Sequence, residues 1–286
     1  MIIVQLKGGL GNQMFQYAFG RSMALFHNTS LKIDVNYFEN QDPGVTPRKY
    51  ELDVFDLKQS YATNKEIQSI QQQYPNWIQK SIGKLLPRFR PVFKEKNEKY
   101  IKSIFFALNN VYFKGYWQNE KYFKNIEILI REEFSFKHPL SQKAKSLLEE
   151  IGSNESVSLH IRRTDYIGKA VGEVCTPGYY KKAIQHIEDL KNNIRLYVFS
   201  DDIEWVRSNL AFSHPTIFVD KTYTENIDWM DMQLMSKCKH NIIANSSFSW
   251  WAAWLNDNPK KIVIAPNEWN FKKNINDIIP PEWITI

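Results

Sequence analysis

The sequence predicts an α/β protein whose C-terminal half forms a parallel β-sheet. Past residue 153, short apolar runs alternate with loops and with stretches whose apolar residues lie at helical spacing. Buried apolar strands joined by helices are typical of parallel sheets, because the crossover helices cover both faces of the sheet. The expected strands are Val157–Ile161, Leu196–Phe199, Thr216–Val219, Ile242–Ala244 and Ile262–Ala265.

Two of the connecting segments carry a clear helical pattern, with apolar residues three or four positions apart. One segment follows the first of these strands and the other precedes the fourth. The residues are Tyr180, Ile184 and Ile187 in the first case, and Met230, Leu234 and Cys238 in the second.

The N-terminal half begins with a strand, turn and helix of its own. The apolar run Ile2–Leu6 precedes the glycine-rich turn Gly8–Gly11, and a helix with one apolar face follows. Further helices are expected over 120–133 and 140–151.

The chain of 286 residues is long enough for two domains. The strand pattern becomes regular after the polar segment Gly152-Ser153-Asn154. We therefore expect one domain over residues 1–152 and a second over residues 153–286.

Cysteine usage favours a reducing compartment. Cys175 and Cys238 are the only cysteines, and they lie far apart and outside any CxxC pattern, so neither a disulfide framework nor a zinc cluster is expected. The apolar run at the start of the sequence is too short for a signal peptide or a membrane span. The expectation is a cytoplasmic protein.

The net charge of +6 is concentrated in residues 80–102. This segment holds eight basic and two acidic residues, so 8 − 2 = +6. It is either a solvated basic surface or a surface that touches anionic lipid head groups at the inner membrane. Binding of nucleic acid is not expected, because no recognisable nucleic-acid module accompanies the segment.

Polar side chains follow each of the five expected C-terminal strands. In open α/β sheets, ligands bind beyond the carboxyl ends of the strands. The arrangement therefore predicts a nucleotide site on this edge. The polar groups are Arg162 to Asp165, Ser200 to Asp202, Asp220, Asn245 to Ser247, and Asn267 with Glu268.

Arginine at the end of the first C-terminal strand suits a diphosphate. Side chains alternate between the two faces of a strand, so His160 and Arg162 share one face and Arg163 points away. A guanidinium stays charged and offers a planar fork of donors that matches phosphate oxygens. Alternatively, Arg163 forms a surface salt bridge, for example with Asp165.

A helix start after the fourth strand offers a second group for a phosphate. Ser246 and Ser247 are good N-cap residues, and a helix N-terminus binds anions through its free N–H groups and its dipole. Plain helix capping is the alternative and is compatible with the first interpretation. Trp250, Trp251 and Trp254 are expected to pack this helix onto the sheet rather than to stack on sugars.

Two further features bear on the ligand. Asp231 lies in the first turn of the helix before the fourth strand, where it either complements the helix dipole or accepts the N–H donors of guanine. The sequence contains no Asp-x-Asp pair of the kind that holds a metal on a sugar-nucleotide diphosphate. Arginine and helix N-termini are expected to take that role without a metal.

Five segments spread across most of the chain form a recognisable set: GGLGNQMFQYA from Gly8, GYWQ from Gly115, HIRRTDY from His160, FSDD from Phe199 and NSSFSWW from Asn245. Together, and in this order, they resemble the bacterial α-1,2-fucosyltransferases of glycosyltransferase family 11. The resemblance implies a GT-B fold, in which two Rossmann-like domains face each other across a cleft. It also implies inverting, metal-independent transfer from GDP-β-L-fucose, with no cofactor.

The resemblance further implies an acceptor-binding domain over 1–152 and a GDP-fucose-binding domain over 153–286. The implied acceptor is a galactose-terminated glycan, either free or linked to a lipid, as in O-antigen or lipopolysaccharide biosynthesis. It suggests that Arg162 holds the β-phosphate beside His160, with Asp231 on guanine. The other implied site residues are Asn12, which reaches the donor; Asp201 and Asp202, which organise the basic pocket; Ser246, Ser247 and Phe248 at the diphosphate; and Glu173, a candidate catalytic base.

Other functions stay open on the sequence alone. One is transfer of a different GDP-linked sugar. Another is a Rossmann dehydrogenase, although Gly8–Gly11 is not a GxGxxG turn and Asp34 is the nearest candidate for the acidic residue of such a fingerprint. A third is a non-catalytic glycan-binding protein that uses some of its nine Trp residues.

Overall fold

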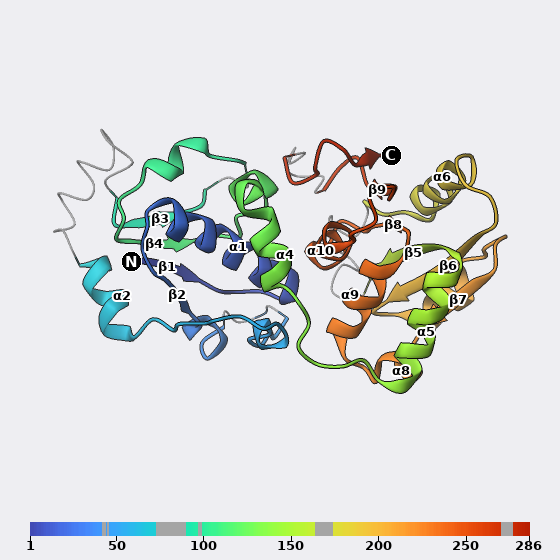
Figure 1. Ribbon diagram of the computed structural model, residues 1–286, viewed down its shortest axis with the longest axis horizontal. Coiled ribbons are helices and arrows are strands. Elements are labelled where there is room, and N and C mark those ends of the chain that lie inside the picture. The colour runs from blue at the N-terminus through green and yellow to red at the C-terminus, as the bar shows by residue number, and fades with distance from the viewer. Residues whose placement is uncertain (42–43, 45, 73–89, 97–98, 164–173, 270–276) are drawn as a thin grey trace. The chain divides into compact units, whose positions relative to one another are not determined.

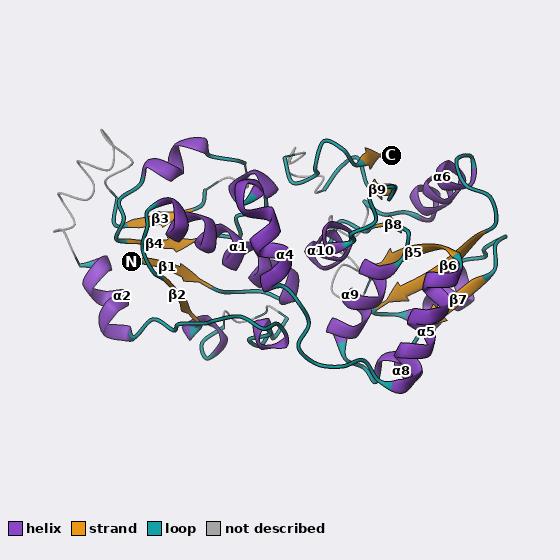
Figure 2. Ribbon diagram, viewed as in Figure 1, coloured by secondary structure: helices purple, strands orange, loops and turns teal. Residues whose placement is uncertain are grey.

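The computed structural model describes most of the chain, and the description covers residues 1–41, 44, 46–72, 90–96, 99–163, 174–269 and 277–286. The chain divides into two compact units, Met1–Lys137 and His138–Ile286 (Figure 1). Each unit contains one parallel sheet with helices packed on it (Figure 2). The prediction of two Rossmann-like α/β domains is confirmed.

The first unit has a four-stranded sheet in the order β2-β1-β4-β3, and all neighbouring strands are parallel. Its strands are β1 (Ile2–Gln5), β2 (Leu31–Asp34), β3 (Val92–Lys94) and β4 (Val111–Lys114). Its helices are α1 (Leu10–Phe26), α2 (Asn64–Gln71) and α4 (Glu127–Glu133), with short 3-10 turns η1 (Asn36–Phe38), η2 (Leu52–Val54), η4 (Lys102–Phe106), η5 (Glu120–Tyr122) and η6 (Lys124–Ile126).

Helix α1 lies close against this sheet because Gly20 faces it. A Cβ atom at Gly20 would come within 2.6 Å of a Val4 methyl group and 2.8 Å of a Leu31 methyl group, so any other residue here would force these side chains to shift. Further along, the ring of Phe19 stacks on buried Trp117 at 4.3 Å between centroids. These contacts fix α1 over β1, which in turn sets the position of the glycine turn before the helix.

The second unit has a six-stranded sheet in the order β10-β9-β8-β5-β6-β7, again with parallel neighbours. Its strands are β5 (Glu155–Ile161), β6 (Ile194–Ser200), β7 (Thr216–Val219), β8 (His240–Ile242), β9 (Val263–Ala265) and β10 (Ile284–Thr285). Its helices are α5 (Gln142–Ser153), α6 (Pro177–Glu188), α7 (Ile203–Asn209), α8 (Lys221–Thr224), α9 (Asp228–Lys237) and α10 (Ser247–Leu255).

The two faces of strand β5 meet different helices, as the alternation predicts. Val157, Leu159 and Ile161 belong to a core with residues of α6 and α7. His160, on the other face, contacts Phe248 of α10. Trp250, Trp251 and Trp254 of α10 are buried, so the expectation that they pack rather than bind sugar agrees with the fold.

The division between the units falls at Lys137 and His138, earlier than the expected boundary near Gly152. The reason is helix α5, which the sequence pattern assigned to the first domain. Its buried residues Ala144, Leu147 and Ile151 pack against the second unit, where α5 contacts α8, α9 and β5.

Several predicted elements differ in their bounds. Strand β8 spans His240–Ile242 rather than Ile242–Ala244, and both ring nitrogens of its buried first residue, His240, are hydrogen-bonded. The helix predicted over 120–133 is regular only from Glu127; the preceding residues form the turns η5 and η6.

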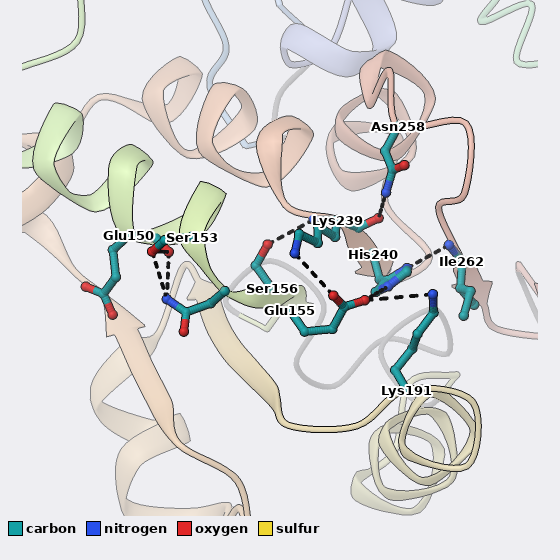
Figure 3. Close-up of polar contacts among 10 residues, drawn as sticks. Glu150, Ser153, Glu155, Ser156, Lys191, Lys239, His240, Asn258 and Ile262 are labelled. Carbon is teal, nitrogen blue, oxygen red and sulfur yellow. Dashed lines mark hydrogen bonds and ion pairs between the residues drawn. The ribbon is translucent and has the colours of Figure 1, made fainter.

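The hydrogen bonds of His240 form part of a polar cluster at the amino edge of the second sheet (Figure 3). Its Nδ1 accepts the Ile262 N–H at 2.9 Å, and its Nε2 lies 2.8 Å from a Glu155 carboxylate oxygen. Lys239 and Lys191 approach the same carboxylate at 3.2 and 3.8 Å. The cluster joins β5, β8, α6 and the start of β9.

Candidate functional site

Each described sheet has one topological switch point. This is the place between two neighbouring strands where the direction in which the chain adds strands to the sheet reverses. In the second sheet this point lies between β5 and β8, because β6 and β7 extend one side and β8 to β10 the other. In the first sheet it lies between β1 and β4. The carboxyl ends of the strands at such points are where open α/β sheets bind ligands.

His160 lies near the carboxyl end of β5 at the second switch point. Its side chain is buried, and its ring centroid lies 5.9 Å from that of Phe248 on α10. Among the described residues, its Nδ1 has no hydrogen-bond partner. Burial, with a smaller contribution from the charge of Arg162, lowers the pKa of His160 to about 4, so its imidazole is neutral at pH 7. A buried, unpaired ring nitrogen is a group that a ligand can satisfy.

The two arginines after β5 diverge, and each meets one aspartate after β6. Arg162 Nε lies 3.3 Å from Asp201 Oδ2, while Asp201 Oδ1 accepts the backbone N–H of Arg163 at 2.8 Å. Asp201 therefore holds this part of the chain at two points. The Arg162 side chain is 21% exposed, so its guanidinium is held in place and still reaches the surface.

Arg163 turns to the α7 side of the sheet. Its Nε lies 3.2 Å from Asp202 Oδ2, and its guanidinium carbon lies 3.4 Å over the Trp205 ring. Asp202 also caps α7 by accepting the Trp205 N–H. The suggested pair with Asp165 lies outside the described residues. Of the two arginines, Arg162 thus shares the His160 face and Arg163 has a structural role.

Helix α10 begins at the same switch point, directly after β8. Ser246 is its N-cap, with the side-chain oxygen accepting the Phe248 N–H at 3.4 Å, and Ser247 is its first residue. The first turn carries no acidic residue. Asn245 is buried and holds the loop by donating to the Trp269 carbonyl at 3.2 Å. The helix N-terminus and Arg162 provide positive potential at one sheet edge.

Asp231 is in the first turn of α9, as predicted. This helix begins shortly after β7 ends and finishes just before β8 starts, so its N-terminus lies toward the same carboxyl edge. Asp231 Oδ1 is buried and has no hydrogen-bond partner among the described residues. Burial, with a smaller contribution from the charge of Asp228, raises the pKa of Asp231 to about 7. A buried acceptor without a donor favours a ligand that brings one.

Asn12 belongs to the first unit and lies at the switch point of that sheet. Its side-chain oxygen accepts a hydrogen bond from Gln118 Nε2 at 2.7 Å, which links the loop after β4 to the first turn of α1. Gly8 has φ of +80°, and a Cβ atom there would lie 2.5 Å from Asn12 Nδ2. The turn therefore needs glycine both for its backbone conformation and for the space beside Asn12.

Two buried glutamines of the same segment were not singled out from the sequence. Gln13 donates to the Gly8 and Lys49 carbonyls, both at 2.8 Å, and Gln16 donates to the Gly115 carbonyl at 3.1 Å. Hydropathy does not identify them. A glutamine is polar, so its hydropathy predicts an exposed position even where, as here, the side chain is buried and its polar atoms are hydrogen-bonded.

Several expected site residues lie outside the described part of the chain. They are Glu173, the candidate base, and Thr164, Asp165 and Tyr166 of the segment after Arg163. In the described ranges, no group of three or more His, Cys, Asp or Glu side chains is arranged to hold a metal ion.

Comparison with known proteins gives the family. The model of glycosyl transferase family 11 matches residues 1–286. The chain is 37% identical to an alpha-1,2-colitosyltransferase of Escherichia coli, over 100% of this chain and 99% of that protein. It is 33% identical to the O-antigen biosynthesis glycosyltransferase WbnK of the same organism, over 98% and 99%.

Among solved structures, NodZ α-1,6-fucosyltransferase co-crystallised with GDP superimposes with a TM-score of 0.52 at 16% identity, over 92% of this chain and 94% of that one. This likeness confirms the GT-B type of fold. The match of the family model over the whole chain favours a transferase over the dehydrogenase interpretation. The chain belongs to glycosyl transferase family 11 and is a glycosyltransferase.

Proposed function

We propose that the protein transfers L-fucose from GDP-β-L-fucose to the 2-hydroxyl of a terminal galactose, with inversion at the anomeric carbon. One observation carries the donor part of this proposal. At a single edge of the second sheet, a held arginine and a helix start lie near a buried neutral histidine, and a buried carboxylate with one unpaired oxygen lies toward the same edge. A guanosine diphosphate supplies a partner for each group.

The diphosphate end of the donor meets positive groups. Arg162 binds the β-phosphate, and the N-terminal N–H groups of α10 with Ser246 and Ser247 bind the remaining oxygens. Charge develops on these oxygens as the bond to fucose breaks, so groups that are already fixed in place stabilise the transition state most. Asp201 supplies this fixation for Arg162. The transfer proceeds in this proposal without a metal.

The base end of the donor meets Asp231. In its ionised form this carboxylate accepts the N1–H and the 2-amino N–H of guanine. Adenine offers no such pair, which makes Asp231 a specificity group for the guanine nucleotide. Its pKa near 7 in the free protein means that binding guanine requires loss of a proton below that pH.

The reaction is a single displacement. The galactose 2-hydroxyl attacks C1 of fucose on the side opposite GDP, and the C1–O bond to the diphosphate breaks as the new C–O bond forms. The hydroxyl proton leaves to a base, for which Glu173 is the candidate. His160 lies beside the sugar or phosphate and offers its Nδ1. Asn12, whose side-chain oxygen accepts from Gln118, is a further candidate for donor binding.

The acceptor and the exact donor sugar are best tested together. The colitosyltransferase relative favours one competing donor, GDP-colitose, since colitose is fucose without its 3-hydroxyl. The relative named for O-antigen biosynthesis favours a glycan of that class as acceptor.

The experiment offers purified protein GDP-fucose or GDP-colitose with a panel of galactose-terminated oligosaccharides, and determines the product linkage by NMR. We expect an α-1,2 product and a higher kcat/KM for GDP-fucose. A preference for GDP-colitose would change the donor and leave the rest of the proposal intact. Glycan binding without transfer from either donor would overturn the proposal and support a non-catalytic glycan-binding protein.

A further inference from the structure

Exposed apolar side chains gather at one place on the first unit. The described residues include seven large hydrophobic side chains that are strongly exposed, and four of them come from the end of α1 and from the segment around η4. These four are Leu25, Phe26, Ile101 and Phe106, with Phe106 65% exposed. The ring of Phe26 contacts that of Phe105, at 5.4 Å between centroids, which joins the two segments. We call these five residues the apolar patch.

The segment that displays the patch is rigidly attached. Ile104 of η4 is buried, and the Ile101 N–H donates to the hydroxyl of buried Tyr122 at 2.9 Å. The Phe105 ring also contacts Tyr122, at 6.4 Å between centroids. Phe106 is therefore held outward by a fixed turn. Apolar side chains clustered on a surface mark an interaction site, whereas scattered ones do not.

Two exposed lysines, Lys99 and Lys102, flank Ile101 of the patch along the chain. Among the described residues of 90–102, the one acidic side chain is Glu95, and it is directed at the backbone N–H of Tyr116, 2.6 Å away. The Glu95 carboxylate thus accepts hydrogen bonds from the backbone of Tyr116 and Trp117, and residues 99–102, at the patch, carry basic side chains and no acidic one.

We propose that the apolar patch, together with Lys99 and Lys102, forms a surface that docks on an anionic phospholipid bilayer. Phenylalanine and aliphatic side chains enter the boundary between head groups and acyl chains, and lysines bind the anionic head groups around them. Neither contribution alone gives stable binding, and both are present here. The proposal concerns where the enzyme works and goes beyond the reaction that it catalyses.

The chemistry favours a bilayer over nucleic acid. Nucleic acid attracts the same lysines, and aromatic rings stack on bases, but the aliphatic side chains Leu25 and Ile101 have no use on a base or a phosphate. They do partition into a bilayer. No helix among the described residues is long and apolar enough to cross a membrane, so docking would be peripheral.

The test is co-sedimentation of the full chain with sucrose-loaded vesicles. One set contains phosphatidylglycerol and phosphatidylcholine at 30:70, and the other contains phosphatidylcholine alone. We expect binding to the anionic vesicles that weakens with added salt, and little binding to the neutral ones. Lys99→Glu with Lys102→Glu should weaken anionic-vesicle binding by about 30-fold or more.

The apolar part has its own variants. Phe106→Ser should weaken binding by roughly tenfold, and Phe106→Trp should retain it, because tryptophan suits the membrane interface. Ile128→Ser is the matched control, since Ile128 is also strongly exposed but lies on α4, outside the two segments that form the patch. The control for Lys99→Glu with Lys102→Glu is Lys181→Glu with Lys182→Glu, which makes the same change in net charge on α6.

Three results would overturn the proposal: patch variants that bind as well as their controls, equal binding to neutral and anionic vesicles, or binding to a DNA oligonucleotide but to neither vesicle. Activity on a soluble galactoside should be unchanged in every patch variant. Loss of vesicle binding with retained transfer therefore separates this proposal from the proposed function, and equal thermal unfolding midpoints confirm that the variants are folded.

Discussion

The two edges of the second sheet each carry a buried histidine and an acidic residue, but the hydrogen bonding of these side chains differs. At the amino edge, His240 uses both ring nitrogens, and Glu155 meets Lys239, Lys191 and His240 together. At the carboxyl edge, His160 Nδ1 and Asp231 Oδ1 are buried without a hydrogen-bond partner among the described residues. The difference separates groups that hold the fold from groups that await a ligand, because leaving a buried polar atom unpaired costs about 1–3 kcal/mol.

The largest effect is expected at Arg162. Arg162→Ala should lower kcat by about a hundredfold or more, because it removes a fixed positive group from the departing diphosphate. Arg163→Ala is the matched control and should lower kcat less than about fivefold, since Arg163 is engaged by Asp202 and Trp205. Steady-state transfer from GDP-fucose measures both. Near-normal turnover of the Arg162 variant would show that Arg162 does not stabilise the departing diphosphate.

The next effect distinguishes the two histidines. His240→Ala should lower the free energy of unfolding by about 3 kcal/mol, because Glu155 and the Ile262 N–H lose a buried partner. His160→Ala should lower it by only about 1 kcal/mol, since no described residue loses a hydrogen bond, but should weaken GDP-fucose binding. Urea unfolding and calorimetry provide the two measurements. The comparison fails if the two variants lose equal stability.

The third prediction uses the pKa of Asp231. A carboxyl with a pKa of about 7 is mostly protonated at pH 6 and mostly ionised at pH 8, and guanine requires the ionised form. Affinity for guanosine, which carries no phosphate to titrate, should therefore fall about tenfold from pH 8 to pH 6.

Asp231→Asn should bind guanosine weakly at both pH values, without this slope. Asp228→Asn should keep the slope but move it to lower pH, because the negative charge of Asp228 helps to raise the pKa of Asp231. A flat profile in the unaltered protein, or a slope that survives in the Asp231 variant, would argue against guanine binding here.

The smallest effect belongs to the first unit. Gln118→Glu keeps the side-chain shape but removes the donor to Asn12, so kcat/KM should fall about fivefold as the Asn12 amide loses its fixed orientation. In a protein that already carries Asn12→Ala, the same change should have almost no further effect. Additive losses in the double variant would mean that Gln118 acts independently of Asn12.

Sequence patterns predicted the parallel sheet of the second unit and the face on which His160 and Arg162 lie, because strand alternation and apolar spacing are local. They missed what depends on distant contacts. The burial of His240 follows from partners on two other strands, and α5 belongs to the second unit through its packing on α8 and α9.

The same holds at the site. The positions of Arg162, Ser246 and Asp231 followed from strand ends and helix starts. Strand alternation also predicted that Arg163 points away from Arg162. The partners that hold the two arginines apart (Asp201, Asp202 and Trp205) and the anchoring roles of Gln13 and Gln16 required the folded chain. Residues that read as ordinary polar positions become informative only when their partners are known.

Binding of GDP by calorimetry in the presence of EDTA tests the central claim most directly. The account predicts that the unaltered protein binds GDP under these conditions. It also predicts that Arg162→Ala weakens GDP binding by at least about twentyfold while leaving guanosine binding unchanged, because the arginine meets only the diphosphate. Equal GDP affinity of the two proteins, or GDP binding that requires added Mn²⁺, would contradict it.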